Sequence, residues 1–418
     1  MMMLVAMPTK AFAASPPDVT AGDVCAIVNN GGDDEGYASL ADAWAAASDG
    51  DAIYLLANIN EPATLIDLDD FLLTIDLNGF NLDIKCIDLV SDSSLTITNS
   101  KPATGGDITL FDYLGVDGSY LKIDARSVSI NPGNGIQAVN SAEVLITADI
   151  NSAGKGILAN GEDVKVTIHG NITAVDECIA AENGATVTVY GNLKGDFGID
   201  ARSEGTVVKV YGNIDADEDG IDAFQEAYVY LKGNITAVWI GVSVVAEALV
   251  EVEGDIKVTG DDTADDRDEF PAGVLAALYG EALIKGNITV LGDDGVGVAC
   301  ALGGLVTLDG KIVAETYILF MDVVFEDDLQ EWVFIEKTAA DNDATSQKPD
   351  YLQYSQEFAG EYPDLGIFAG TSYVWVKDFT PPTGDSMGMI VMMTALSLLA
   401  LGALCLLVWR KRQQVTAY

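Results

Sequence analysis

Acidic side chains gather in one stretch of the sequence, and their spacing there could support chemistry. The stretch contains Asp196, Asp200, Asp215, Asp217, Glu218, Asp219 and Asp222. Asp200 and Asp222 hold the same place in a recurring Gly-Ile-Asp-Ala phrase, so a repeat fold would bring their carboxyl groups together. Two neighbouring carboxyl groups can act as general acid and base or can hold Ca²⁺. We therefore take Asp200 and Asp222 as candidate catalytic residues, with a solvated acidic face as the alternative.

A second group of acids lies in an insertion that follows Gly254. It includes Asp261, Asp262, Asp265 and Asp266. A loop that protrudes from a repeat is a frequent place for ligand contacts, and these carboxylates could chelate Ca²⁺. The spacing is not that of an EF-hand, because Ala272 stands where the twelfth-position glutamate belongs. The alternative is a plain solvated loop, and no cofactor other than Ca²⁺ is expected.

Composition excludes several classes of function. The chain has 21 Lys+Arg against 65 Asp+Glu, a formal net charge of −44. Such a surface repels phosphate backbones and anionic headgroups, so we expect no nucleic-acid partner and no basic membrane patch. The only histidine, His169, excludes multi-histidine metal sites and makes a Ser-His-Asp hydrolase improbable.

Two glycine phrases recur with one period. Gly-Asn-Ile/Leu begins at Gly170, Gly191, Gly212 and Gly233, with intervals of 21 residues, and continues at Gly254, Gly286 and Gly310. A Gly-Ile/Val-x-Ala/Val phrase runs in parallel from Gly135, Gly156, Gly198, Gly220, Gly241, Gly273 and Gly297. Two phrases that share a period indicate a solenoid.

Apolar residues alternate inside each repeat, as at Val164, Val166 and Ile168, which predicts strands. A parallel β-helix fits this pattern, because stacked coils turn each apolar position into a continuous core. Leucine-rich repeats have a similar length, but these units lack the leucine ladder. One corner should then carry a ladder of asparagines that bond along the stack, with the preceding glycine in a positive-φ turn: Asn171, Asn192, Asn213 and Asn234. The same column continues at Asp255 and Asn287. His169, Tyr190 and Tyr211 should form a surface column beside it.

A short helix is expected before the first coil, with Ser39 as its N-cap and Asp42 three residues later. This helix is followed by Asp49-Gly50-Asp51 and by segments rich in apolar residues at 53–56 and 73–77. The order resembles the start of pectin-lyase-like right-handed β-helices in bacterial surface proteins. That resemblance implies an all-β, right-handed parallel β-helix over residues 37–315, with about 21 residues per coil and a capping helix. It also implies a fold in which lyases and hydrolases place aspartates on neighbouring coils. Residues 14–36 would lead into the solenoid, and residues 316–378 would cap it or form a small β module.

The N-terminus reads as the tail of a secretory signal peptide. Residues 1–7 are apolar, and Ala11-Phe12-Ala13 is a small-x-small cleavage pattern. We expect cleavage between Ala13 and Ala14.

The C-terminal residues 379–418 combine three signals. Residues 387–409 carry no charge and are long enough for a transmembrane helix, and Arg410-Lys411-Arg412 follows as a cytoplasmic stop. Before them, Thr380, Pro381, Pro382, Thr383 and Gly384 resemble the Leu-Pro-x-Thr-Gly cell-wall sorting signal of Gram-positive surface proteins, with Thr380 in place of Leu. The resemblance implies sortase cleavage between Thr383 and Gly384 and attachment of Thr383 to peptidoglycan. A permanent single-pass anchor is the alternative.

Four cysteines precede the C-terminal segment: Cys25, Cys86, Cys178 and Cys300. They are too scattered for a disulfide framework, so we expect buried thiols, with a Cys25–Cys86 bridge as the alternative. Taken together, the sequence predicts a non-catalytic adhesion or surface-interaction scaffold displayed on a cell wall, whose host or glycan ligand is unknown. The alternative is a wall-attached polysaccharide lyase or glycoside hydrolase that uses Asp200 and Asp222.

Overall fold

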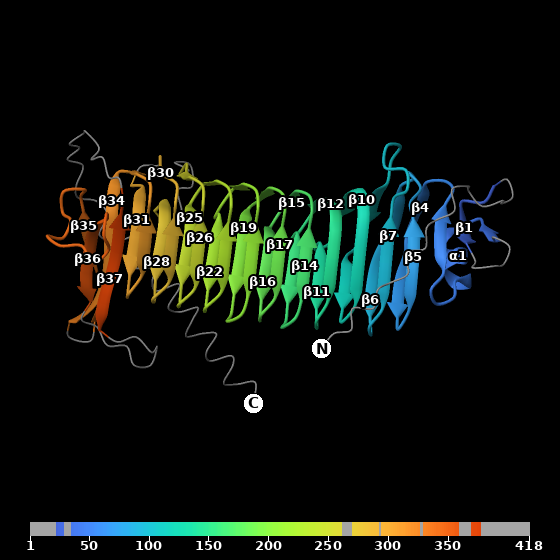
Figure 1. Ribbon diagram of the computed structural model, residues 1–418, viewed down its shortest axis with the longest axis horizontal. Helices are drawn as coiled ribbons and strands as arrows, with labels where there is room; N and C mark the ends of the chain where they lie inside the picture. Colours follow the sequence, from blue (N-terminus) through green and yellow to red (C-terminus); the bar gives the residue numbers. More distant parts are fainter. Residues whose placement is uncertain are drawn as a thin grey trace, which may run out of the picture.

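The computed structural model describes residues 22–28, 35–260, 270–291, 294–326, 329–358 and 369–377. They form a β-solenoid of about 12 turns, wound into a rod whose coils follow one another in chain order (Figure 1). A turn takes about 22 residues, slightly more than the repeat period predicts. The difference comes from longer coils on both sides of the regular run: the equivalent corner residues Asn81 and Asp107 lie 26 residues apart, and Asp255 and Asn287 lie 32 apart.

Each coil contributes strands to three parallel sheets. The first sheet contains β3 (Ala52–Leu55), β5 (Leu72–Asp76), β7 (Ser94–Thr98), β14 (Lys165–Ile168), β17 (Thr186–Val189), β20 (Val207–Val210), β23 (Tyr228–Leu231), β26 (Leu249–Val252), β29 (Glu281–Ile284), β32 (Leu305–Leu308) and β37 (Gly370–Val376). The second contains β8 (Asp107–Leu110), β15 (Ile172–Ala174), β18 (Leu193–Gly195), β21 (Ile214–Ala216), β24 (Ile235–Ala237), β27 (Ile256–Val258), β30 (Ile288–Val290) and β33 (Ile312–Val313). The third contains β9 (Leu114–Asp117), β11 (Ile136–Val139), β13 (Ile157–Asn160), β16 (Glu177–Glu182), β19 (Phe197–Arg202), β22 (Ile221–Phe224), β25 (Ile240–Val245), β28 (Ala272–Ala277), β31 (Val296–Ala301) and β34 (Thr316–Glu326).

Four longer strands turn a corner and join two sheets: β4 (Ile59–Asp69) and β6 (Leu82–Val90) link the second and third, and β10 (Tyr120–Ile130) and β12 (Glu143–Ser152) link the first and second.

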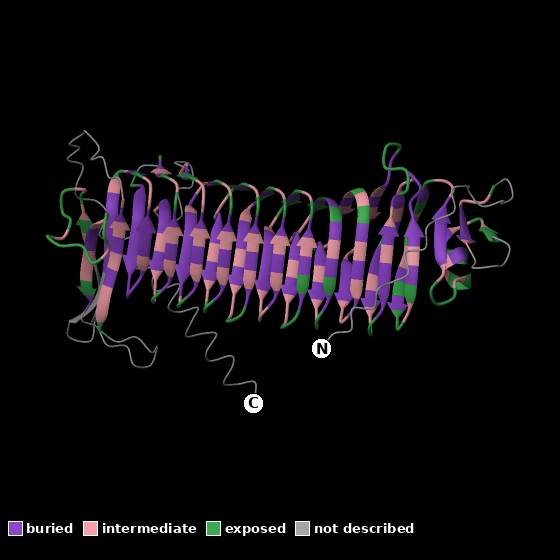
Figure 2. Ribbon diagram, in the orientation of Figure 1, coloured by how far each residue is buried: buried purple, intermediate pink, exposed green. Residues whose placement is uncertain are grey.

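Alternation explains the interior. In β14, Val166 and Ile168 are at most 1% exposed, while the alternate residues Lys165 and Thr167 face outward. The same pattern gives the strands alternating buried and intermediate bands (Figure 2). Because equivalent strands pair in register, the inward residues of all coils join one continuous apolar core that reaches from Cys25 to Val376.

A column of polar residues runs along the corner before the second sheet. In its regular part, the Oδ1 atom of each residue accepts the backbone N–H of the equivalent residue in the next coil. The N···O distances are 2.9 Å for Asn171–Asn192, 2.8 Å for Asn192–Asn213 and 2.9 Å for Asn213–Asn234. The column therefore satisfies one N–H group per coil that would otherwise bond only to water.

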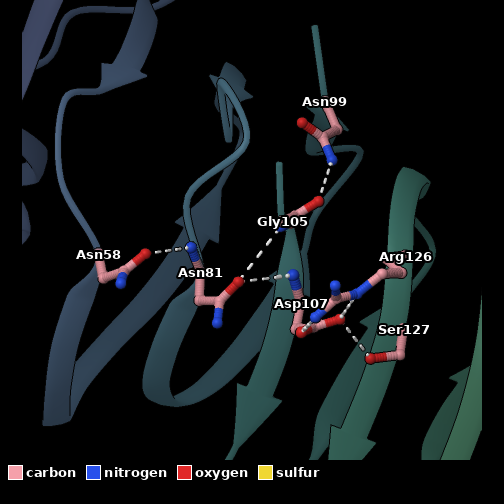
Figure 3. Close-up of polar contacts among 8 residues, drawn as sticks. Asn58, Asn81, Asn99, Gly105, Asp107, Arg126 and Ser127 are labelled. Atoms are coloured by element: carbon pink, nitrogen blue, oxygen red, sulfur yellow. Dashed lines mark hydrogen bonds and ion pairs between the residues drawn. The ribbon is translucent and has the colours of Figure 1, made fainter. Parts of the chain in front are cut away.

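This column extends beyond the asparagines that the repeat phrase marks. Figure 3 shows its beginning, where the Asn81 N–H donates to Asn58 Oδ1 and the Asp107 N–H donates to Asn81 Oδ1. Asp107 then binds Ser127 and the Arg126 guanidinium. Later members are Asp149, Asp255 and Asn287, and the column ends where the Lys311 N–H donates to Asn287 Oδ1. Any residue with a short side-chain oxygen acceptor can serve, which is why Asn and Asp interchange along the column.

The glycines before the asparagines have a different role from the expected positive-φ turn. None of Gly170, Gly191, Gly212 and Gly233 is among the positive-φ residues. Instead, a Cβ atom at Gly191 would lie 2.0 Å from the carbonyl oxygen of Gly170 one coil earlier, and the contact at Gly212 would be 2.1 Å. The second glycine phrase has the same cause, since a Cβ at Gly198 would lie 2.3 Å from the Gly220 carbonyl oxygen. Both phrases mark places where backbones of successive coils approach too closely for a side chain.

The N-terminal end is covered by β1 (Cys25–Val28), β2 (Glu35–Tyr37) and α1 (Leu40–Ala46). The Ser39 side chain accepts the Asp42 N–H, as the sequence predicts for an N-cap. The Glu61 carboxylate caps the same helix end by accepting the N–H groups of Leu40 and Ala41. Leu40 and Ala43 on the inner face of α1 are fully buried, so the helix closes the first coil.

At the other end the coils give way to antiparallel strands. After pairing with β31, β34 turns back into β35 (Leu329–Lys337), and β36 (Leu352–Phe358) pairs antiparallel with β37. Phe334 and Phe358 pack on the outer face of the last coils against Ala299, Leu319 and their neighbours, where they form a second apolar cluster. The last strands of the third and first sheets, β34 and β37, therefore pair with antiparallel strands in place of a further coil.

Cys25, Cys86, Cys178 and Cys300 are buried free thiols, so the structure contains no Cys25–Cys86 bridge. Of the helices in the described ranges, none has the length and apolar character needed to cross a membrane. The expected transmembrane span at 387–409, the sorting signal at 380–384 and the signal peptide at 1–13 lie outside those ranges.

Candidate functional site

The two candidate aspartates lie side by side on the outer face of the third sheet. Asp200 in β19 pairs in register with Asp222 in β22, and Ser243 in β25 follows in the same column. Ala180 in β16 precedes them. The strand alternation turns Ile199, Ala201, Ile221 and Ala223 into the core and leaves the aspartates outward. A shared slot in the repeat phrase therefore becomes a pair of carboxyl groups one strand spacing apart, about 4.8 Å between backbones.

One arginine serves this pair. The Arg202 Nε donates to Asp200 Oδ1 at 2.5 Å, and the guanidinium lies 5.4 Å from the centre of the Phe224 ring. Side-chain exposure is 28% for Arg202 and 17% for Asp200, so the ion pair is largely removed from solvent. A charge-assisted bond in such surroundings fixes the orientation of both groups.

Asp222 is held in a different electrostatic state. Burial, followed by the charges of Asp219 and Asp200, raises the pKa of Asp222 from 3.8 to about 8. A hydrogen bond from Ser243 and the positive charge of Arg202 act in the opposite direction but are outweighed. The raised pKa of Asp222 favours its protonated form, beside an Asp200 side chain that is bound to Arg202. Two neighbouring carboxyl groups in such different surroundings are the arrangement that an acid–base pair requires.

The remaining acids of the sequence cluster are distributed over different surfaces. Asp219 stays beside Asp222, and its Oδ1 accepts the Ile240 N–H at 2.9 Å. Asp215 lies on the second sheet and bonds to Lys194 at 2.9 Å. Burial and the charges of Glu218 and Asp217 raise the pKa of Asp196, which lies at the corner between these two sheets. Of the seven acids, Asp200, Asp219 and Asp222 thus meet at the candidate site, whereas Asp196, Asp217 and Glu218 lie together at the neighbouring corner.

No set of three or more His, Cys, Asp or Glu side chains in the described part of the chain has an arrangement that could hold a metal ion. Asp261, Asp262, Asp265 and Asp266, the candidate Ca²⁺ ligands of the insertion, lie outside that part.

Three residues of this site carry no signal in the repeat phrase: Arg202, Phe224 and Ser243. Arg202 and Phe224 stand two residues after the aspartates, at outward positions of the same strands. Their proximity follows from the strand register, which alternation within a single repeat does not reveal.

His169 lies in the expected surface column. Its ring is stacked on Tyr190 at 4.6 Å between centroids, and Tyr190 is stacked on Tyr211 at 4.9 Å. No carboxyl group that could orient the imidazole as a base is bonded to it among the described residues, so the column is a stack of rings on the outside of the first sheet.

Comparison with known proteins gives no relative: no family model, no curated protein and no solved structure matches this chain. The chemistry and placement of its own residues are therefore the ground for a functional proposal.

Proposed function

We propose that this protein is secreted and displayed on a Gram-positive cell wall, where the solenoid acts as a non-catalytic scaffold for adhesion or surface interaction. The observation that carries the proposal is the order of parts along the chain. An unbroken solenoid of about 12 turns is followed by a sequence that resembles a cell-wall sorting signal. The right-handed, pectin-lyase-like winding belongs to the same proposal.

Attachment would follow sortase chemistry at residues 380–384. A sortase cysteine attacks the Thr383 carbonyl, and the bond to Gly384 breaks with release of the Gly384 amine. A peptidoglycan amine then displaces the cysteine and joins the Thr383 carbonyl. Before cleavage, residues 387–409 and the basic residues after them would hold the chain in the membrane.

The acidic surface supports an extracellular scaffold. A net charge of −44 keeps such molecules soluble and apart from one another at high local density. The four described cysteines form no disulfide, so coil packing and the hydrogen bonds between coils hold this part of the chain together.

The test is fractionation of a sortase-bearing Gram-positive host that expresses the full chain. We expect the wild type in the wall fraction, released by a muralytic enzyme. Thr383→Ala should shift it to the membrane fraction or the medium, while the control Thr345→Ala, an exposed threonine upstream, should stay in the wall. Wall attachment that is unchanged in Thr383→Ala would refute the proposal.

A second function, glycan cleavage, is favoured by the paired states of Asp200 and Asp222. A protonated Asp222 would supply the proton to a leaving sugar oxygen, and the Asp200 carboxylate one strand away would stabilise or attack the sugar carbon. Carboxyl groups about 5–5.5 Å apart are typical of retaining glycosidases. This role requires that Asp200→Asn and Asp222→Asn abolish turnover of neutral or acidic glycans while Asp215→Asn, an acid on the neighbouring sheet, does not. Equal rates in all three variants would exclude it.

A further inference from the structure

One region of this acidic protein has no acid on its surface. It covers four successive strands of the first sheet, β14, β17, β20 and β23, and includes the residue after each strand. The outward residues are Lys165, Thr167, His169, Thr186, Thr188, Tyr190, Val207, Lys209, Tyr211, Tyr228, Tyr230 and Lys232. We name this set the aromatic–basic face. It contains no aspartate or glutamate in a chain that has 65 of them.

The rings on this face are ordered. His169, Tyr190 and Tyr211 stack with interplanar angles of 3° and 10°, and Tyr230 meets Tyr211 edge-on at 5.9 Å. Tyr190 is 46% exposed and Tyr211 is 37% exposed, so the ring edges and hydroxyl groups reach solvent. Stacking fixes the rings in advance, and a ligand would lose little side-chain entropy by contacting them.

Three lysines frame the rings. Three other lysines bond to acids: Lys155 to Glu177, Lys194 to Asp215 and Lys285 to Glu253. No such ion pair joins Lys165, Lys209 or Lys232 to any acid of the described chain. Acids border the face on both sides. Glu143 in β12 pairs in register with Lys165, and on β26 Glu251 accepts the Tyr228 hydroxyl while Glu253 binds Lys285. The acid-free area is therefore limited to these four strands.

The size of the face distinguishes between partners. Three strand spacings give about 14 Å along the rod, and two steps of alternate residues give about 13 Å across it. The resulting area of about 200 Å² is far below the roughly 800 Å² per partner that a stable protein–protein contact buries. A short oligomeric ligand matches it better than a second copy of this chain.

We propose that the aromatic–basic face binds a short stretch of anionic polysaccharide, with lysine ammonium groups on sugar carboxylates or sulfates and tyrosine and threonine hydroxyls on sugar hydroxyls. A long polyanion such as duplex DNA would overrun the face onto acidic surface on either side and be repelled. Exposed charges separated by more than about 8 Å are largely screened at physiological salt, so a short ligand senses mainly the lysines. The inference deepens the proposed function, since it names the partner of a displayed scaffold and rests on display only for access to that partner.

The experiment is calorimetric titration of the purified full-length protein with tetragalacturonate, a sulfated tetrasaccharide and neutral cellotetraose. The two anionic ligands distinguish carboxylate from sulfate as the preferred group. The test variant is K165Q/K209Q/K232Q. The matched control is K85Q/K257Q/K311Q, which removes three exposed lysine charges from other surfaces.

We expect the wild type to bind at least one anionic tetrasaccharide and to bind cellotetraose at least tenfold more weakly. The face variant should lose about tenfold in affinity and most of the salt dependence, because each exposed contact contributes modestly. The control should stay within about twofold of the wild type.

Three results would overturn the proposal: equal losses in both triple variants, equal binding of cellotetraose, or no anionic binding by the wild type at about 10 mM ligand. Self-association that only the face variant abolishes, without glycan binding, would assign the face to a second copy instead. All these outcomes leave wall attachment untouched, so the two proposals fail separately.

Discussion

Replacement of Gly212 by alanine should destabilise the solenoid by forcing two neighbouring coils apart. The added Cβ would stand 2.1 Å from the Gly191 carbonyl oxygen and 2.5 Å from its carbon. Ordinary contact begins at 3.4 Å, so the neighbouring coil would have to retreat by about 1.3 Å. Both clashing atoms are backbone, so no flexible side chain can absorb the movement.

That displacement has a calculable cost. Three bonds link these coils at the corner: Asn213 N–H to Asn192 Oδ1 at 2.8 Å, Leu193 N–H to Asn213 O at 2.9 Å and Tyr211 N–H to Val189 O at 2.8 Å. Lengthening each by about 1.3 Å takes it beyond hydrogen-bond range. At about 1 kcal/mol net for each bond, the expected loss is about 3 kcal/mol, before any core gap is counted.

The control is Gly205→Ala. Gly205 has φ of +80°, but a Cβ there would meet nothing nearer than 3.6 Å. Its cost is backbone strain alone, about 1–2 kcal/mol. Guanidinium unfolding followed by circular dichroism measures the difference, and hydrogen exchange of residues 186–216 shows whether the loss is local, as expected when each coil contacts only its neighbours. A Gly212→Ala protein within 1 kcal/mol of the wild type would refute close coil approach as the reason for the glycine.

Four further outcomes follow from the same structure. Burial raises the pKa of Asp222 from 3.8 to about 8, so the folded state favours the protonated side chain. The contribution of Asp222 to the free energy of unfolding is therefore complete below pH 3.8 and is lost as the pH rises to about 8. In thermal melts, Asp222→Asn should be more stable than the wild type at pH 9 and no more stable at pH 4. Asn213→Ala removes the acceptor of the Asn234 N–H and should cost about 1 kcal/mol in denaturant titration, whereas Asn213→Asp keeps an acceptor and should cost less than half of that. Ala246 and Glu247 have positive φ angles of 57° and 62°, a conformation that Asn and Gly adopt more readily. Replacing both residues by Asn-Gly should raise the free energy of unfolding by about 1 kcal/mol, and a lower melting temperature would contradict a positive-φ turn at this position. Burial raises the pKa of Cys25 and of Cys178 to about 12, so a thiol reagent should label neither in the folded protein and both after denaturation; rapid labelling of the native chain would contradict their burial.

The repeat phrases predicted the stacking of coils because one physical constraint acts on every turn. A backbone that passes within contact distance of its neighbour admits only glycine, and this recurs wherever coils are equal in length. The polar column was predicted from Asn171 to Asn287, where the glycine phrase marks it. Its first members, Asn58 and Asn81, were not predicted because neither follows a glycine.

The candidate site was predicted in part. The shared phrase placed Asp200 beside Asp222, but the pairing of Arg202 with Asp200 and the raised pKa of Asp222 depend on side-chain packing. The predicted reason for the glycines before the asparagines was wrong. These glycines do not have positive φ angles; they are required because successive coils approach closely, which local sequence preferences do not indicate. The acid-free face was also beyond prediction, because its residues become neighbours only when four strands are laid in register.

The central claim, that successive coils stack directly over one another, is tested most directly by pulsed electron resonance distances along one column of the second sheet. Thr173, Lys257 and Val313 are exposed members of that column, linked through successive registered pairs, and the native cysteines are buried, so introduced labels would react selectively. With about 4.8 Å per coil, labels at Thr173 and Lys257 should lie about 19 Å apart and those at Thr173 and Val313 about 29 Å apart, in narrow distributions. A second distance that does not exceed the first by about two coil spacings, or broad distributions for both pairs, would contradict the stacked solenoid.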